Sequence, residues 1–527
     1  VDGRNHTNTL EPIDAGSIGA TWDNAPNQNV GDNEYMVTEI VMKDVDEKEE
    51  DKDSVKLKTA VQARFQLLQK LNACLKKMLP YVDLSLVGKS WSLAALLGQC
   101  RGLIFSLLKE PIWDHALADT QAPGQIFDLK LSRSRAAKFA NAQDGPDVTG
   151  RYMVFSQAFR QINSMPTTTF RPPRETDRVY NVIFMGERSH DAGGPYRESW
   201  SEYAHELESA SLPLMLRTPN GRHSTGQNRE RWVLNPSPLT QTKRDLFSFL
   251  GKMMGIAVRT RQFMALNVAP MIWDLLVGAE VTGEMLAGVD EMLIQSMTKI
   301  RHIENEGVSE EMFEYVVMET FTTLATDDRS VELLPGGAQR DVTFSSRCEY
   351  ADSVERYRMH EFDEQVACIR EGLSRSLPTG LLSLFTGAEL ERMVCGTPDI
   401  DIDLLESCTE YSSCSANDQH VKFFWQVMRE FSNEERSMFL RFTWGRSRLP
   451  LNAASFSQRF KLLSFSRSPA DQYYPVAHTC FFQLELPQYS SPAIMRDKLR
   501  YAIYNCTAID GDDTGVGMAA AAMGWEE

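Results

Sequence analysis

Cys480 is the residue whose surroundings best suit nucleophilic chemistry. It stands within "PVAHTCFFQLELPQYSS", which runs from Pro475 to Ser491, and His478 lies two residues before it. From Phe482 to Leu486 apolar and polar residues alternate, which is typical of a strand with one buried face. Reactive cysteines tend to lie on loops that rigid structure supports, and a neighbouring histidine favours the thiolate. The segment is therefore a candidate nucleophile site.

The residues alone leave a second interpretation of Cys480 open, namely an ordinary buried thiol. Other nucleophile classes fail by spacing. A phosphatase loop needs HCx5R with small glycines, whereas Phe-Phe-Gln-Leu-Glu follows Cys480, and a papain-like site needs a downstream histidine, which is absent. The Gly193-Gly194 pair lacks both the GK[ST] ending and the GxGxxG spacing, so we do not expect nucleotide binding.

Composition restricts the function classes further. The 527 residues carry a net charge of −17, which argues against a general nucleic-acid binder. The nine cysteines include no CxxC pair, so we expect neither a zinc site of the usual kind nor another metal or cofactor. The most apolar window, 84–108, is interrupted by Lys89, Gln99 and Arg101, which favours buried helices over a membrane span.

The chain changes character along its length. Residues 31–55 hold ten acidic residues and three lysines, and we expect residues 1–54 to be a disordered acidic segment. Residues 55–150 read as a helical extension. No initiator methionine or signal peptide begins the chain, so we expect a fragment of a longer protein. The tail 511–527 is rich in Gly, Ala and Asp and is expected to be flexible.

A helix break precedes the Cys480 segment. The text "HVKFFWQVMREFSNEERSMFLRFTWGRSRLP" (420–450) turns polar at "SNEER", where Ser432 can cap a new helix with Glu435 three residues on. We therefore expect a hinge at 430–434.

Several segments together resemble one family. "HTCFFQLELPQYSS", "SNEERSMFLRFTWGRSRLP", "LLSLFTGAELERMVCG", "FLGKMMGIAV" and "VIFMGERSHDAGGPYRESW" resemble segments of HECT-type ubiquitin ligases, in the order of that family. "KLSRSRAAKFA" and "GRYMVFSQAFRQ" resemble the giant HERC subgroup, which carries RCC1-type repeats upstream; the chain resembles its C-terminal part.

The resemblance implies an α+β, bilobal fold. A mostly helical N-lobe would span 151–431 and a smaller α/β C-lobe 432–510. Cys480 would hold ubiquitin as a thioester before its transfer to a substrate lysine. His478, Thr479 and Phe481 would shape the site, with Thr479 as a hydrogen-bond donor near the acyl oxygen. Arg448 would position the ubiquitin tail or the acceptor, or else form a surface salt bridge.

The resemblance also implies partners, namely an E2 ubiquitin-conjugating enzyme, ubiquitin and unspecified protein substrates. We expect the E2 site within 285–350, with Met312, Phe313, Tyr315 and Phe321 exposed, although a core helix is the alternative there. The end, Gly524-Trp525-Glu526-Glu527, departs from the family pattern. A silent scaffold that binds E2 or ubiquitin without transfer is the competing hypothesis. A cytoplasmic location is expected, with the nucleus as an alternative.

Overall fold

The computed structural model describes residues 52–122, 124–140, 149–173, 176, 178–187, 194–397, 399–450, 452–453, 456, 458–465 and 468–505. For residues 52–59, Cys480 and Asn505 it describes the backbone alone. The predicted acidic segment 1–54, apart from its last residues, and the tail 511–527 lie outside the described residues. Within the described part, no helix combines the length and hydropathy that crossing a membrane requires.

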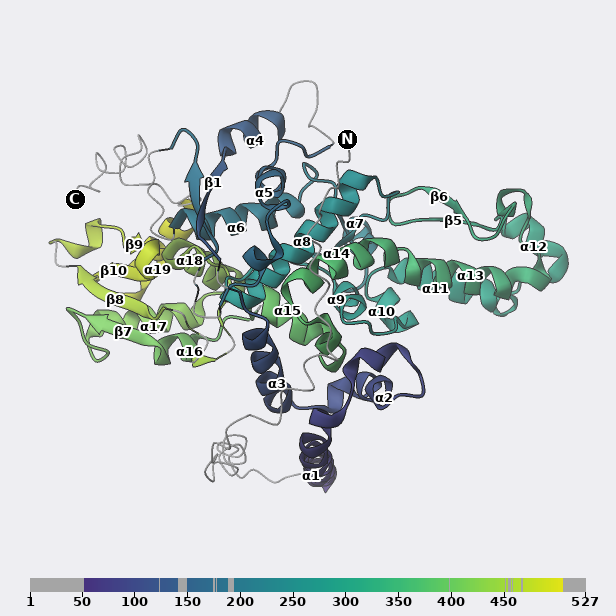
Figure 1. Ribbon diagram of the computed structural model, residues 1–527, viewed down its shortest axis with the longest axis horizontal. Coiled ribbons are helices and arrows are strands. Elements are labelled where there is room, and N and C mark those ends of the chain that lie inside the picture. The colour runs from purple at the N-terminus through teal and green to yellow at the C-terminus, as the bar shows by residue number, and fades with distance from the viewer. Residues whose placement is uncertain are drawn as a thin grey trace, which may run out of the picture. The chain divides into compact units, whose positions relative to one another are not determined.

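The chain divides into two units. Of the described residues, the small unit holds 52–119 together with Pro378–Thr386, and the large unit holds Thr120–Leu377 and the residues from Gly387 onward. In the small unit, the chain forms helices α1 (Lys52–Met78), α2 (Leu93–Gln99) and α3 (Ser106–Asp119) (Figure 1). Ser92 caps α2 by accepting the amide hydrogen of Ala95 at 3.0 Å, and Trp113 packs edge-on against Phe385.

The helical extension predicted for 55–150 therefore ends at Asp119. Strand β1 (Phe127–Leu131) pairs in parallel with β2 (Tyr180–Phe184) and so belongs to the large unit. The segment "KLSRSRAAKFA" (130–140) begins in β1 and continues into a helix, α4 (Arg133–Ala140). A strand whose partner lies about fifty residues further along cannot be recognised from local periodicity.

The helical part of the large unit is built around two closely packed helices, α8 (Gln241–Thr260) and α14 (Asp363–Ser376). It also comprises α5 (Val154–Ile162), α6 (Gly194–Leu207), β3 (Met215–Arg217), α7 (Pro219–His223), β4 (Trp232–Leu234), α9 (Pro270–Leu276), α10 (Gly283–Ala287), α11 (Glu291–Arg301), α12 (Glu310–Val316), β5 (Thr322–Leu324), β6 (Ser330–Glu332), α13 (Arg347–His360) and α15 (Gly387–Cys395). Glycines at the interface allow helices α8 and α14 to pack closely. A methyl group at Gly251 would collide with the Ile369 carbonyl, and one at Gly372 would collide with the Ser248 carbonyl.

The C-terminal part of the large unit is a four-stranded sheet covered by helices. Its elements are α16 (Ile402–Ser407), β7 (Thr409–Ser412), α17 (Gln419–Glu430), α18 (Asn433–Trp444), β8 (Phe460–Phe465), β9 (Val476–His478), β10 (Gln483–Pro487) and α19 (Pro492–Asn505). The strand order is β7-β8-β10-β9, in which β8 runs parallel to β7 and β10 and only β9 is antiparallel. This arrangement confirms the predicted α+β fold class.

The lobe boundary predicted at 431/432 is wrong. The helix break itself is confirmed, because Ser432 and Glu435 form the predicted capping box at the start of α18. However, Ile400 to Ile503 share one hydrophobic core, β7 pairs with β8, and α17 packs on α19. A boundary should separate two cores, and this break lies within one. The chain instead enters this core after Gly396, whose positive φ of 77° and close approach to Arg448 and Leu449 mark the crossing.

Candidate active site

Cys480 lies in a short turn between two antiparallel strands. Residues Thr479–Phe481 form one turn of 3-10 helix, β9 precedes it and β10 follows it, and the pair His478–Gln483 closes the hairpin. The predicted alternation is confirmed: Phe482, Leu484 and Leu486 are buried, whereas Phe481 is 59% exposed. The burial of one face of β10 therefore fixes how the turn is presented.

Phe482 ends the turn in a strained conformation. Its φ of 47° and ψ of 55° are left-handed, which is uncommon for an aromatic residue. Its ring is fully buried, stacked on Trp444 with centroids 4.1 Å apart and tilted against Phe460 at 5.0 Å. Such strain persists only where packing over-determines it, and it gathers at functional sites. The aromatic core therefore holds the backbone of the Cys480 turn in one shape.

The residues predicted to flank Cys480 lie beside it on described elements. The His478 imidazole Nε2 lies 3.1 Å from Glu485 Oε1, across the β9–β10 pair. The Thr479 carbonyl accepts a hydrogen bond of 3.0 Å from Arg197 in α6. The role expected for the Thr479 hydroxyl near an acyl oxygen is not tested by this geometry.

Arg448 is not part of a surface salt bridge. It is only 7% exposed, and its guanidinium Nη2 donates to the Leu266 carbonyl and to Asn267 Oδ1, each at 3.1 Å. Its Nη1 lies 3.8 Å from Glu391, which Arg231 also contacts at 2.8 Å. These partners belong to the helical part, so Arg448 ties the two parts of the large unit together near the Gly396 crossing.

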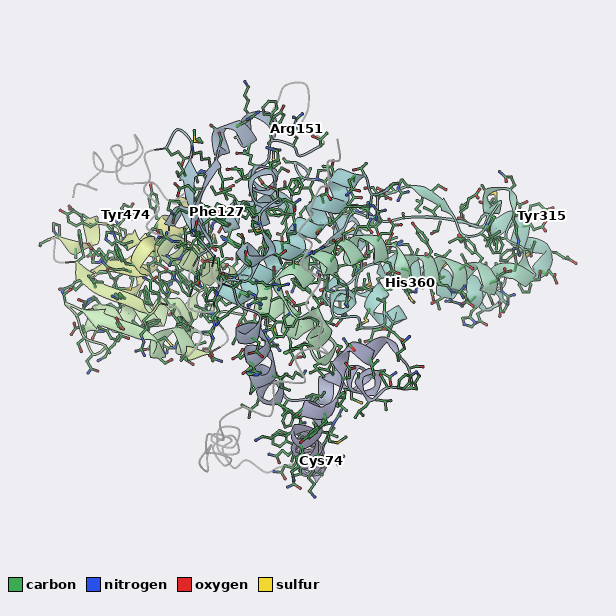
Figure 2. All side chains as sticks on the ribbon, viewed as in Figure 1. Cys74, Phe127, Arg151, Tyr315, His360 and Tyr474 are labelled. Carbon is green, nitrogen blue, oxygen red and sulfur yellow. The ribbon has the colours of Figure 1, made fainter. Side chains whose placement is uncertain are left out.

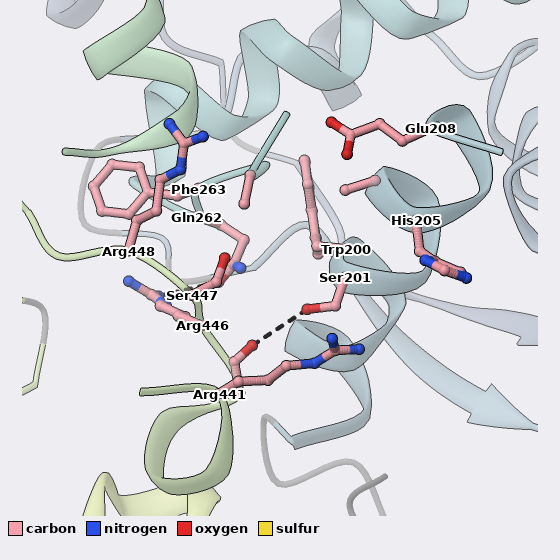
Figure 3. A pocket seen from close by; sticks show the side chains of 13 residues that line it. Trp200, Ser201, His205, Glu208, Gln262, Phe263, Arg441, Arg446, Ser447 and Arg448 are labelled. Carbon is pink, nitrogen blue, oxygen red and sulfur yellow. Dashed lines mark hydrogen bonds between the residues drawn. The ribbon is translucent and has the colours of Figure 1, made fainter. Parts of the chain in front are cut away.

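A cavity of about 150 Å³ lies beside these contacts. It is lined by α6, by the segment after α8 and by the end of α18 with the residues that follow (Figure 3). Arg446, which is 7% exposed, donates from Nη2 to Gln262 Oε1 at 3.0 Å, and the Ser201 hydroxyl donates to the Gly445 carbonyl at 3.4 Å. The lining is cationic with one carboxylate, Glu208, whose pKa burial raises.

Sequence reasoning missed Arg197 and Arg446. The alternating arginines of "GRSRLP" are the sequence signal that could have indicated Arg446, because residues two apart in an extended segment share a side and both arginines bond to the helical part. Nothing in the local text indicates the role of Arg197, because the residue it contacts lies 282 positions away.

The predicted E2-binding residues divide into two pairs. Met312 is 51% and Tyr315 82% exposed, on the arm formed by α11, α12, α13, β5 and β6 (Figure 2). Phe313 and Phe321 are fully buried in a separate small core, edge-on against Phe344 and Tyr350. The prediction that these two phenylalanines are exposed is therefore wrong. Helix α12 is seven residues long and buries one face. Phe313 lies on that buried face, so Met312 and Tyr315 are on the exposed side.

Among the described residues, no group of three or more His, Cys, Asp or Glu side chains is placed to hold a metal ion. A thiol in a constrained turn with a histidine two residues away suits acyl transfer through a covalent intermediate.

Comparison with known proteins identifies the family. A family model described as HECT-domain (ubiquitin-transferase) matches residues 201–510. The E3 ubiquitin-protein ligase HERC2 of Mus musculus is 37% identical over 462 residues, which cover 86% of this chain and 9% of that protein, and HERC2 of Homo sapiens gives the same values. The E3 ubiquitin-protein ligase pub1 of Schizosaccharomyces pombe is 29% identical over 357 residues, or 67% of this chain and 44% of that protein.

This chain thus spans only 9% of the length of either HERC2 protein. The matched region nonetheless includes α8, the arm, the C-terminal sheet and the turn that carries Cys480. The chain belongs to the HECT family.

Proposed function

We propose that the large unit is an E3 ubiquitin-protein ligase that carries ubiquitin as a thioester on Cys480. The observation that supports this most directly is the placement of Cys480 in a turn fixed by the left-handed, buried Phe482, in a chain of the HECT family. Covalent catalysis of this kind divides one acyl transfer into two steps.

In the first step the Cys480 thiolate attacks the carbonyl carbon of the E2–ubiquitin thioester. A new C–S bond forms, and the E2 cysteine leaves as its thiolate. In the second step a substrate lysine amine attacks the Cys480 thioester, an isopeptide bond forms, and Cys480 leaves as a thiolate while the amine loses a proton. The turn needs no nucleotide of its own, since ATP is consumed earlier, when an E1 enzyme activates ubiquitin.

Other residues receive supporting roles in this proposal. His478, Thr479 and Phe481 shape the surroundings of the thioester. Arg448 acts through position: it anchors the segment after α18 to the helical part. The proposed lobes are 120–395, without the small-unit residues 378–386, and 400–505, and the crossing that begins at Gly396 is the pivot between them.

The arm is the proposed E2-docking site, with Met312 and Tyr315 as contact residues. Both expose apolar surface there, as do Val316, Met318 and Leu324. Exposed apolar patches of this kind mark protein interaction sites. The protein substrates are not specified by these features, and action in the cytoplasm or nucleus is proposed from the reduced thiols.

The proposal is tested by charging with E1, a panel of E2 enzymes, ubiquitin and ATP, followed by non-reducing gels. We expect an adduct that a thiol reagent removes and that Cys480→Ala abolishes. Cys348→Ala, which removes an exposed thiol on α13, is the matched control and should leave the adduct intact. An adduct that depends on Cys348 would contradict the assignment, and no adduct with any E2 would favour the silent scaffold.

A further inference from the structure

Arg197 joins the helical part of the large unit to the turn that carries Cys480. It lies on α6, and its guanidinium Nη1 donates to the Thr479 carbonyl at 3.0 Å. Its Nη2 donates to Gln458 Oε1 at 3.3 Å. Both acceptors belong to the C-terminal part, so one cation holds two points of that part against α6.

The bond from Arg197 to the Thr479 carbonyl is the shorter of the two that this carbonyl accepts from described residues. The other comes from the Phe482 amide at 3.5 Å, which is long for a hydrogen bond. Charge-assisted bonds are stronger than neutral ones. Arg197 is therefore the principal partner of the carbonyl that opens the Cys480 turn.

Several other contacts between the two parts, among the residues that the structure describes, lie near the pivot. Arg446 and Arg448 reach residues 261–267, and Leu449 bridges to Thr397 in the crossing itself. Contacts near a pivot can persist while the parts rotate, whereas a contact at the far turn must break. A rotation of the C-terminal part would therefore break the hydrogen bonds of Arg197, whereas those of Arg446 and Arg448 could persist.

The turn and the arm lie at opposite ends of the large unit. Figure 1 shows β9 and β10 at one end and α12 at the other, and Figure 2 labels Tyr474, in the segment leading into β9, and Tyr315 at these ends. If an E2 docks on the arm, the Cys480 turn must leave α6 to reach it. An interaction that exists only in one of two states lowers the population of the other.

We infer that Arg197 is a positioning residue that retains the Cys480 turn against α6 and thereby slows the transfer of ubiquitin from the E2. This inference rests on the proposed function. Loss of the contact raises the population of the undocked state by about tenfold, which corresponds to about 1.4 kcal/mol.

The test is single-turnover transfer from a ubiquitin-charged E2 to Cys480 in the whole chain. We expect Arg197→Ala to react about tenfold faster than the wild type, and Arg197→Lys, which keeps the charge but not the fork, to lie between them. Arg244→Ala is the matched control, since it removes a helix arginine paired with Glu364 on the surface, and should react at the wild-type rate. Unchanged or slower transfer in Arg197→Ala would overturn the inference.

A second measurement separates this inference from the proposed function. Amide hydrogen exchange at residues 479–482, without E1 or E2, should be faster in Arg197→Ala than in the wild type. Gln458→Ala should give a smaller effect, and the two changes together should give less than their sum, because both remove one interaction. Unchanged exchange would refute the contact even if thioester forms. Faster exchange with no thioester in any variant would refute the proposed function instead.

Discussion

Replacement of Phe482 separates backbone strain in the Cys480 turn from the packing of the aromatic ring. Truncation to alanine removes a fully buried ring from contact with Trp444 and Phe460, which costs about 3–5 kcal/mol of stability. The left-handed backbone costs an L-residue with a Cβ about 1–2 kcal/mol, and glycine avoids that cost. Glycine otherwise loses roughly 1 kcal/mol to alanine through the entropy of the unfolded chain.

The two effects act in opposite directions at this position. We therefore expect Phe482→Gly to be at least as stable as Phe482→Ala, by about 0–1 kcal/mol. The matched control is Leu484, which is equally buried but lies within β10 in extended backbone. There Leu484→Gly should be less stable than Leu484→Ala by about 1 kcal/mol.

Native-state hydrogen exchange of amides in β8 and β10 is the suitable assay, because it reports the opening of the C-terminal core within the intact chain. If Phe482→Gly fell below Phe482→Ala by the same margin as at Leu484, the strain in the turn would be refuted. The account of how the aromatic core shapes the Cys480 turn would then fail.

The arm and α6 give two further predictions. Tyr315→Ala should change the free energy of unfolding by no more than about 0.5 kcal/mol but weaken ubiquitin transfer from the E2. Phe313→Ala removes a buried ring and should cost about 3–5 kcal/mol of stability. Thermal melts and charging assays distinguish the two variants, and equal melting temperatures would contradict the difference in burial. Burial raises the pKa of Glu206 from 4.5 to about 7, so the folded protein binds this proton more tightly than the unfolded chain. The wild type should therefore lose about 3 kcal/mol of stability relative to Glu206→Gln as the pH rises from below 4.5 to 7. A difference in melting temperature between the two proteins that does not change with pH would contradict this.

The local sequence predicted the secondary structure around Cys480 correctly. Alternation from Phe482 to Leu486 was enough to predict a strand with one buried face, because one face of β10 packs on a core. The capping box of Ser432 and Glu435 was also predicted correctly, because both residues that form it lie within four positions of the sequence.

Features that depend on distant packing could not be read in this way. The sequence predicts a hinge between lobes at 430–434, yet the helices on its two sides share one core with β8 and β10. Phe313 and Tyr315 are both aromatic residues of one short helix, and only the packing against Phe344 decides which one is exposed. The bond from Arg197 to Thr479 spans 282 positions and leaves no local signature.

The most direct test of the central claim replaces the sulfur of Cys480 by oxygen. In Cys480→Ser, ubiquitin transferred from an E2 would be held as an oxyester, which resists thiol reagents but is cleaved by alkali, whereas the wild-type adduct yields to thiol. Mass spectrometry of the trapped species should place the ubiquitin C-terminus on residue 480. A thiol-resistant adduct at that position is the predicted result. An adduct in Cys480→Ser that stays thiol-sensitive, or that maps to another cysteine, would contradict the assignment of Cys480 as the acceptor.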